Sequence, residues 1–293
     1  MMFSKLFVQQ NIKINCKALI QEHKIDMSNK NFEIAMNAAL EAGKKIMKVY
    51  DSVIEVEYKG DKSPLTQADK EANDVINRYL KPTNIPIISE ENKQIDYIVR
   101  KEWKTCWIVD PVDGTKEFIK RNGEFTVNIA LVSNGKPELG VIYMPASKIL
   151  YYADVLKQQA YKAELESHDT DIETVLANSI SLKTKENKQI VKVVGSRSHM
   201  TKETLSFVES LKSSGQNVEI ISKGSSLKFC LIAEGDANIY PRFAPTMEWD
   251  TAAGQAICNA VGINVLSEDT KQPLLYNKKN LTNPWFVASK LKN

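Results

Sequence analysis

The sequence is poor in the residues that bind soft metals and cross-link chains. It contains three histidines and four cysteines, and Cys16, Cys106, Cys230 and Cys258 are far apart with no C-x-x-C pair. A structural zinc site needs such ligands at close spacing, so this class of site is disfavoured. The last three cysteines lie in apolar segments, which is typical of buried free thiols in a reducing compartment. We therefore expect a cytoplasmic protein.

The chain also lacks a long apolar run and a strong excess of either charge. No segment approaches the length of a transmembrane span. The 39 Lys and Arg residues nearly balance the 36 Asp and Glu residues, for a net charge of +3, and the lysines are scattered. We therefore expect no nucleic-acid partner. At 293 residues, the chain can form one large domain or two interlocked ones.

Residues 1–26 differ in composition from the rest of the chain. They form a basic segment rich in Asn, Gln and Lys, with one weakly apolar patch over 1–8. A disordered tail, an organelle-targeting peptide and upstream sequence from a misplaced start all remain open. The absence of Arg and the scarcity of Ser weaken the targeting interpretation. We expect a disordered or dispensable arm, whose charge permits contact with a membrane surface, and a single folded unit over 27–293.

Hydrophobic periodicity indicates two halves with different organisation. Over about 27–155, an amphipathic helix at 32–50 precedes apolar runs joined by short turns such as Asn134-Gly135, which predicts an antiparallel sheet. Over about 156–293, residues 157–190 show no clear pattern, and strands then alternate with helices. The predicted strands are 53–58, 86–89, 106–109, 125–132, 139–143, 149–153, 191–194, 218–221, 237–240, 262–266 and 285–288, and the other predicted helices are 66–80, 201–211, 226–232 and 248–261.

Two carboxylates follow the apolar run 106–109. Asp110 ends this predicted strand, Pro111 should block further strand hydrogen bonding, and Asp113 comes three residues later. Carboxylates at one strand end repel each other unless a cation lies between them, and hard divalent ions such as Mg²⁺ take oxygen ligands. An Asp-Pro and Asp-Gly surface turn is equally compatible with these residues.

Three more acids occupy positions that also have plain structural explanations. Asp69 falls in the first turn of a helix capped by Thr66, where an acid is favourable. Glu90 follows the strand 86–89 and could belong to an exposed acidic turn, and Asp250 could cap a helix. Two acidic clusters at strand ends nevertheless favour a ligand site.

Several cationic and hydroxyl side chains lie near junctions between loops and helices. Free backbone N–H groups and the helix dipole make such junctions suitable for phosphate, although a single Lys or Arg there is more often a solvated surface charge. These residues are Ser196, His199, Ser225, Lys228 and Arg242.

Three separated motifs resemble those of the inositol monophosphatase-like superfamily of Mg²⁺-dependent, lithium-sensitive phosphatases. They are Asp110-Pro-Val-Asp113-Gly114-Thr115, Glu90 upstream of it and Trp249-Asp250-Thr-Ala-Ala downstream. The resemblance covers nearly everything from about Phe32 to Ala288 and is closest to the bacterial 3′(2′),5′-bisphosphate nucleotidases of the CysQ type. That branch has Lys-Glu-Phe at 116–118, where inositol phosphatases usually have Thr-Asn-Phe. Ser89 departs from the Gly that inositol phosphatases usually carry there.

The resemblance implies an α/β (α+β) fold, the layered α-β-α-β-α sandwich of the inositol monophosphatase and fructose-bisphosphatase type. The N-terminal half would bind two or three Mg²⁺ ions and the C-terminal half the substrate. Asp69 and Thr115 would orient the attacking water, with Glu90 assisting. The implied metal ligands are Glu90, Asp110, the Val112 carbonyl, Asp113 and Asp250. The implied substrate contacts are Glu90, Val112, Asp113, Gly114, Thr115, Ser196, His199, Ser225, Lys228, Arg242 and Asp250.

The activity that the resemblance implies is hydrolysis of adenosine 3′,5′-bisphosphate to AMP and phosphate in sulfur metabolism. A phosphatase for inositol or another sugar phosphate is the nearest alternative. A non-catalytic nucleotide- or RNA-binding protein is a more distant one, because buried acids without a metal reduce stability. The partner would be a small nucleotide bisphosphate, and the sequence leaves open whether the protein is a monomer or a homodimer.

Overall fold

The computed structural model describes residues 30–58, 60, 64–183, 190–196 and 200–290. The expected arm over 1–26 and the predicted substrate residue His199 therefore lie outside the described part of the chain. Among the described residues, no helix combines the length and apolar character that a membrane span requires.

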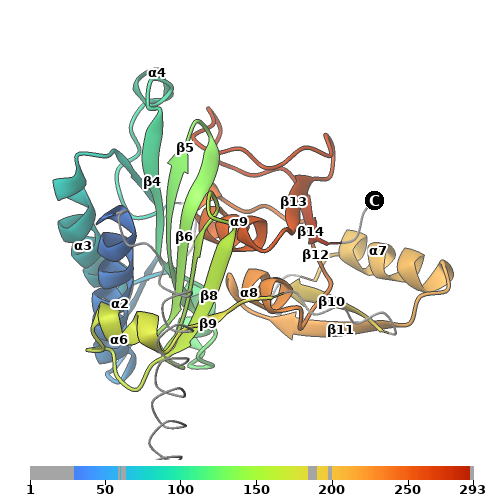
Figure 1. Ribbon diagram of the computed structural model, residues 1–293, viewed down its shortest axis with the longest axis horizontal. Coiled ribbons are helices and arrows are strands. Elements are labelled where there is room, and N and C mark those ends of the chain that lie inside the picture. Colours follow the sequence, from blue (N-terminus) through green and yellow to red (C-terminus); the bar gives the residue numbers. More distant parts are fainter. Residues whose placement is uncertain (1–29, 59, 61–63, 184–189, 197–199, 291–293) are drawn as a thin grey trace, which may run out of the picture.

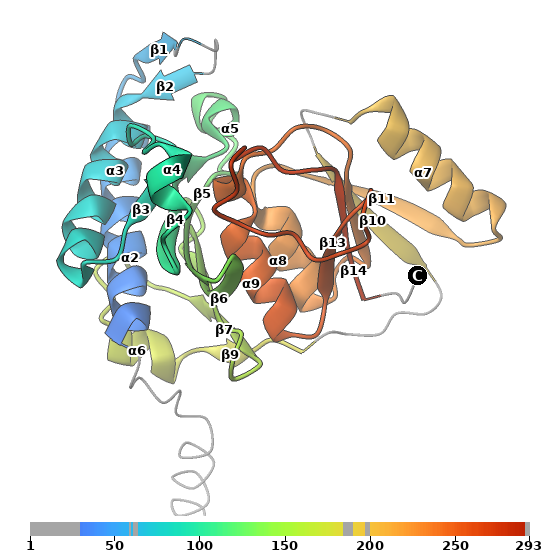
Figure 2. The same cartoon turned by 90° about the horizontal axis from the view of Figure 1, so that it is seen from above.

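The helices and sheets stack in five layers, which confirms the predicted α-β-α-β-α sandwich (Figure 1). Helices α2 (Lys30–Tyr50) and α3 (Gln67–Leu80) cover the outer face of a seven-stranded sheet, called here the first sheet. Helices α8 (Leu227–Glu234) and α9 (Ala252–Ala260) separate it from a five-stranded second sheet, as the view from above also shows (Figure 2). Helix α7 (Lys202–Ser213) forms the fifth layer.

The first sheet has the order β3-β4-β5-β6-β7-β8-β9. Only β3 and β4 are parallel, so the predicted antiparallel arrangement is confirmed for the other neighbours. Its last two strands come from the segment without a clear pattern, and the expected division near residue 155 falls inside this sheet. The strands are β3 (Ile87–Ser89), β4 (Thr105–Asp113), β5 (Thr126–Ser133), β6 (Lys136–Met144), β7 (Ile149–Asp154), β8 (Gln159–Glu164) and β9 (Ile180–Ser181).

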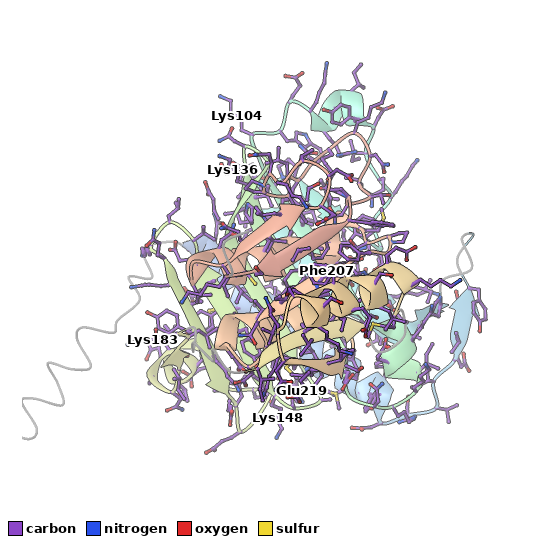
Figure 3. The ribbon with its side chains drawn as sticks, turned by 90° about the vertical axis from the view of Figure 1, so that its right-hand side faces the viewer. Lys104, Lys136, Lys148, Lys183, Phe207 and Glu219 are labelled. Atoms are coloured by element: carbon purple, nitrogen blue, oxygen red, sulfur yellow. The ribbon has the colours of Figure 1, made fainter. Side chains whose placement is uncertain are left out.

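The second sheet has the order β11-β10-β12-β14-β13, with β10 parallel to both neighbours and β14 antiparallel to both of its own. Figure 3 looks onto its α7 side, where Phe207 lies on the helix and the labelled lysines are spread apart. The strands are β10 (Val191–Ser196), β11 (Val218–Lys223), β12 (Ile239–Arg242), β13 (Asn264–Ser267) and β14 (Phe286–Ser289).

Short elements connect the layers. The strand predicted over 53–58 is confirmed only for its last three residues, which pair with a strand that was not predicted. These elements are β1 (Val56–Tyr58), β2 (Pro64–Thr66), α4 (Tyr97–Arg100), α5 (Thr115–Ile119), α6 (Ile172–Ala177) and the 3₁₀ turns η1 (Lys81–Thr83) and η2 (Glu248–Asp250).

The prediction that Pro111 ends its strand is wrong. Strand β4 continues to Asp113, but its register against β5 shifts after Asp110. Asp110 pairs with Asn128 and Asp113 pairs with Thr126, so β4 advances three residues while β5 advances two. The extra residue forms a β-bulge, and the proline lies inside it, where its missing N–H interrupts no regular ladder bond.

Helices on both faces explain why the central strands are buried along their length. On β5, all residues from Thr126 to Val132 are buried, as expected for strands covered on both sides. The inner helix α9 packs tightly against β6 at Gly140, where an added Cβ would lie 2.5 Å from the Ala253 carbonyl oxygen and 2.6 Å from the Ala256 Cβ.

The variant Gly140→Ala should therefore separate α9 from the first sheet and destabilise the protein. Overpacking of this kind typically costs about 1–3 kcal/mol, which thermal or urea unfolding would detect. Gly60→Ala is the control, because nothing lies within 4 Å of the added Cβ there. Equal stability of the two variants would contradict this packing.

Candidate active site

A cavity of about 220 Å³ lies where the first sheet meets segments of the second. Its walls come from the ends of β3 and β4, the start of α5, the turn before α8, and the ends of β10 and β12. The structure brings together most of the predicted site residues, and those that line the cavity are Glu90, Asp110, Val112, Asp113, Gly114, Thr115, Ser196, Ser225, Lys228, Arg242 and Asp250.

Three carboxylates meet at one side of this cavity. Oxygen atoms of Asp110, Asp113 and Asp250 all lie within 4.8 Å of one another. Glu90 follows β3, the parallel neighbour of β4, and its N–H donates to the Val109 carbonyl at 3.2 Å. The segments that carry Glu90 and Asp110 at the ends of their strands therefore lie side by side.

The bulge in β4 explains how two acids three residues apart reach one site. On a regular strand, such residues point to opposite faces of the sheet. The extra residue between Asp110 and Asp113 restores the alternation, so that both carboxylates turn toward the cavity. The Val112 N–H donates to Asp110 Oδ1 at 3.1 Å, which holds the bulge closed.

Asp113 is held by a side chain of the first sheet and by two side chains of the turn before α8. Its Oδ2 accepts hydrogen bonds from Ser225 Oγ at 2.8 Å, Ser226 Oγ at 2.7 Å and Asn128 Nδ2 at 3.3 Å. None of the hydrogen bonds found in the described part of the chain falls on Oδ1. That oxygen is therefore the ligand atom that Asp113 can offer to a cation.

Burial and repulsion from neighbouring carboxylates make Asp110 and Asp250 costly to ionise. Burial raises the pKa of Asp110 well above its usual range, and the charges of Glu90 and Asp113 add to the effect. Burial and the neighbouring Asp113 likewise raise the pKa of Asp250 to about 8. A divalent cation among the oxygens would reverse this effect, and a set made only of oxygen donors fits a hard ion such as Mg²⁺.

Asp69 lies beside the cavity, where it both caps helix α3 and contacts Thr115. It completes the capping box of α3, because its Oδ2 accepts from the Thr66 N–H at 2.8 Å and from Thr66 Oγ1 at 2.6 Å. Its Oδ1 accepts from Thr115 Oγ1 at 3.3 Å. The helix cap thus fixes the carboxylate that orients the threonine.

The same face of α3 also holds the turn that carries Glu90. Asn73 and Asn77 follow Asp69 at intervals of four residues, one helical turn apart. Asn73 accepts from Ser89 Oγ at 2.8 Å and donates to Asn92 Oδ1 at 2.9 Å, and Asn77 donates to the same oxygen at 3.1 Å. Ser89 stands where inositol phosphatases usually have Gly, and its hydroxyl thus binds helix α3.

Two cationic side chains, Lys228 and Arg242, also line the cavity. Lys228 Nζ lies 5.5 Å from the centre of the Tyr240 ring and donates to the Ser225 carbonyl. Burial lowers the pKa of this amine to about 8, against the opposing influence of Asp113. Arg242 Nη2 donates to the Pro245 carbonyl at 3.2 Å, and its buried Nε has no partner among the described residues.

Two turns bring backbone amides to the cavity. Gly114 has a φ of +93°, and an added Cβ there would lie 3.0 Å from the Glu124 carbonyl oxygen. Ser225 has a φ of +51°, a conformation unusual for a residue with a side chain. The Gly224 N–H donates to Glu124 Oε2 at 2.8 Å, so a residue of the first-sheet side fixes the turn that precedes α8.

Sequence analysis missed several polar residues of the site. Asn128 donates to Ser226 and Asp113, and the Ser226 hydroxyl, which donates to Asp113, also lies 3.0 Å from the Asp250 carbonyl oxygen. An amide in the middle of the apolar run 125–132 was the available signal for Asn128. Nothing in the local sequence distinguishes Ser226 from a cap of α8.

Residues 28–290 match the model of the inositol monophosphatase family. Proteins named 3′(2′),5′-bisphosphate nucleotidase CysQ are 44% identical to the chain: that of Salmonella typhimurium over 85% of this chain and 95% of its own, and that of Escherichia coli K12 over 86% and 96%.

Solved structures agree with this match. The crystal structure of CysQ from Bacteroides thetaiotaomicron is 48% identical, with a TM-score of 0.81, and the similarity covers 90% of this chain and 99% of that one. The suhB protein of Bartonella henselae, at 22% identity and a TM-score of 0.67, shares the fold.

The metal-free protein should lose thermal stability as the pH rises from about 5 to about 8. Asp250 has an ordinary pKa of 3.8, whereas the folded state keeps its proton to about pH 8. Within this window the folded state binds more protons than the unfolded state, so stability falls with rising pH. Melting temperatures measured in a chelator across this range test the expectation.

Added Mg²⁺ should flatten this fall, because it binds the ionised carboxylates. The variant Asp250→Asn cannot ionise and should be more stable than the wild type at the upper end of the range without metal. A metal-free melting temperature that increases over the window would contradict the raised pKa values.

Proposed function

Because the chain belongs to the inositol monophosphatase family, we propose that it is a phosphatase that removes the 3′-phosphate of adenosine 3′,5′-bisphosphate to give AMP and phosphate. The observation that carries the proposal is the cluster of Asp110, Asp113 and Asp250 in one cavity with Lys228 and Arg242. The identity of 44% to proteins named bisphosphate nucleotidases supports the nucleotide substrate.

We propose Mg²⁺ as the metal, bound as two or three ions. The carboxylates of Glu90, Asp110, Asp113 and Asp250 would hold it together with the Val112 carbonyl. When bound, Mg²⁺ supplies neutralisation of phosphate oxygens and lowers the pKa of a coordinated water. The raised pKa values of Asp110 and Asp250 support a cation site, because the ion removes the repulsion that raises them.

In the proposed reaction, Thr115 and Asp69 orient the attacking water and take its proton. The Thr115 hydroxyl donates to Asp69 Oδ1 at 3.3 Å, so its oxygen can accept a hydrogen bond from the water. As the water attacks phosphorus, its proton passes to Thr115 Oγ1 while the threonine proton passes to Asp69. The bond between phosphorus and the 3′ oxygen breaks, and that oxygen takes a proton from solvent.

Residues around the two turns would bind the anionic parts of the substrate. The backbone amides of Gly114 and Thr115 at the start of α5 suit the departing phosphate. Ser196, Ser225, Lys228 and Arg242 also line the cavity and suit the retained phosphate and the nucleoside. His199 lies outside the described residues, and its role stays a prediction. A phosphate beside Lys228 would raise the lowered pKa of its amine and keep it charged.

The physiological setting that we propose is sulfur metabolism in the cytoplasm. The buried free thiols Cys106, Cys230 and Cys258 support a reducing compartment. Inositol or sugar phosphates remain the alternative substrates, since they would use the same metal site. We propose that the metals bind on the first-sheet side of the cavity and that the nucleoside binds on the second-sheet side.

Phosphate release with Mg²⁺ from adenosine 3′,5′-bisphosphate and from inositol 1-phosphate, measured side by side, tests the substrate. We expect kcat/KM to favour the nucleotide by at least about 100-fold, since a missing charged group leaves its binding residues unpaired. Lithium should suppress the reaction. A preference for inositol 1-phosphate would overturn the substrate, and no release from either would favour the non-catalytic alternative.

The variant Thr115→Ala tests the proton pathway. It should lower kcat by about 10²-fold, because proton transfer from the water loses its acceptor. KM should change less than about threefold. Thr115→Ser retains the hydroxyl and serves as the matched control. An effect confined to KM would contradict the proposed role.

A further inference from the structure

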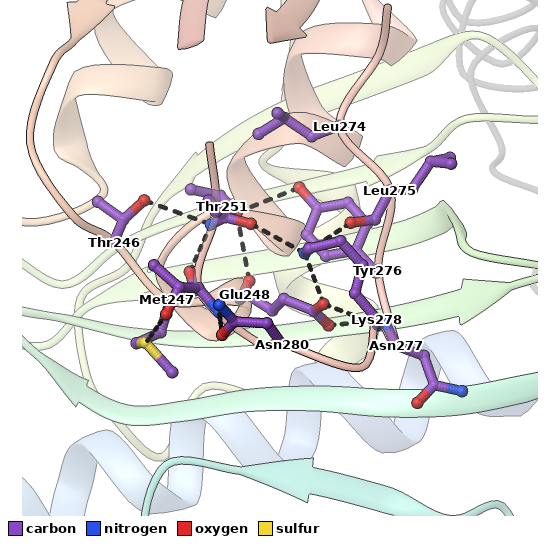
Figure 4. A network of polar contacts seen from close by, with 12 residues as sticks. Thr246, Met247, Glu248, Thr251, Leu274, Leu275, Tyr276, Asn277, Lys278 and Asn280 are labelled. Atoms are coloured by element: carbon purple, nitrogen blue, oxygen red, sulfur yellow. Dashed lines mark hydrogen bonds and ion pairs between the residues drawn. The ribbon is translucent and has the colours of Figure 1, made fainter. Parts of the chain in front are cut away.

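We propose that Asn277 and Lys278, called here the 277–278 turn, lock the relative position of the two sheets at the metal site. Glu248, Lys278 and Arg100 are then positioning residues for the ligand Asp250. The inference rests on the metal site of the proposed function. Figure 4 shows the contacts of this turn with Glu248.

Glu248 holds the 3₁₀ turn that carries Asp250. It is the first residue of η2, two positions before Asp250, and it is fully buried. Its Oε2 accepts from the Asn277 N–H at 2.6 Å, and its Oε1 accepts from the Lys278 N–H at 3.0 Å and from Lys278 Nζ at 2.6 Å. Both oxygens are thus engaged by the 277–278 turn, and η2 cannot shift without breaking charge-assisted bonds.

Arg100 holds the same turn from the first-sheet side. It ends α4, between β3 and β4, and is 3% exposed. Its Nη1 donates to Asn277 Oδ1 at 2.7 Å, and Nη1 and Nη2 donate to the Lys278 carbonyl at 3.2 and 3.3 Å. In return, Asn277 Nδ2 donates to the Arg100 carbonyl at 2.7 Å.

The backbone of Asn277 suits the turn. Its φ of +58° lies in the left-handed region, which asparagine adopts more readily than most other residues with a side chain. Here, Glu248 binds the backbone N–H of Asn277 and Arg100 binds its side chain.

The contacts continue from Arg100 toward Glu90. Arg100 Nε donates to the Ile95 carbonyl at 2.9 Å. The preceding residue, Gln94, donates through Nε2 to the carbonyl of Ser89 at 2.7 Å. A chain of polar contacts outside the cavity thus connects the segment before Glu90 with the turn of Asp250. Glu90 follows β3 of the first sheet and Asp250 lies in η2, after β12 of the second sheet, so the connection helps to set their separation.

A buried ion pair can also contribute to stability without positioning a metal ligand. These two explanations, positioning and stability alone, predict different effects of a substitution on metal binding. The variant Lys278→Met removes the ammonium group and keeps an apolar stem beside Tyr276. We expect it to weaken binding of Mg²⁺ by at least about tenfold, as for other residues that orient metal ligands. Calorimetric titration with Mg²⁺ alone measures this without substrate or turnover.

Lys271→Met is the matched control. Lys271 belongs to the same connection between β13 and β14 and pairs with Glu268 at 2.8 Å on the surface. Loss of an exposed pair of this kind has little effect, so its affinity for Mg²⁺ should stay within about twofold of the wild type.

The double variant Glu248→Gln/Lys278→Met separates positioning from stability. It removes the unpaired buried charge, so the melting temperature should recover, while the affinity for Mg²⁺ stays low. Recovery of both together would overturn the inference, as would unchanged affinity in Lys278→Met. If Lys278→Met does not fold, the affinity of the double variant for Mg²⁺ tests the inference instead. No Mg²⁺ binding by the wild type would instead overturn the metal site of the proposed function.

Discussion

The repulsion among buried carboxylates at one end of the first sheet is the constraint on which the site depends. Asp110, Asp113 and Asp250 approach within 4.8 Å of one another, although burial already disfavours the ionised forms of Asp110 and Asp250. Hydrogen bonds from Val112, Asn128 and the two serines of the 225–226 turn hold two of them in place. The fold thus maintains a local excess of negative charge that a cation would relieve.

The carboxylates of this cluster come from distant parts of the chain. Each part therefore needs its own structural feature to orient its carboxylates toward the cavity. A β-bulge turns Asp110 and Asp113 to one face, and the 3₁₀ turn η2 delivers Asp250. Ser226 connects the two origins directly, because its hydroxyl contacts both Asp113 Oδ2 and the Asp250 carbonyl. In the proposed positioning network, Arg100 and Glu248 make a second connection behind the cavity. Metal binding and the docking of the sheets are therefore coupled properties.

The family resemblance predicted the layered fold, and local patterns brought most of the cavity-lining residues to attention, because the acids follow apolar strands or lie at helix starts and the cations lie near junctions between loops and helices. The same local reasoning failed at Pro111. Its missing N–H indicated a strand end, whereas the bulge lets β4 continue. The contact between Arg100 and Asn277 spans 177 residues and leaves no local pattern, since each side chain alone resembles an ordinary surface residue. Long-range polar contacts of this kind can be recognised only when the fold has brought the two segments together.

Groups of opposite charge line one cavity, and this arrangement bears on the choice of substrate. Carboxylates share a cavity of about 220 Å³ with Lys228 and Arg242. With cations on the carboxylates, both sets of residues would attract anions, so a ligand with two separated phosphates could contact each set with one of them. A monophosphate could contact only one set and would leave the other without a phosphate. That loss is a physical reason for a bisphosphate to be preferred over a sugar monophosphate.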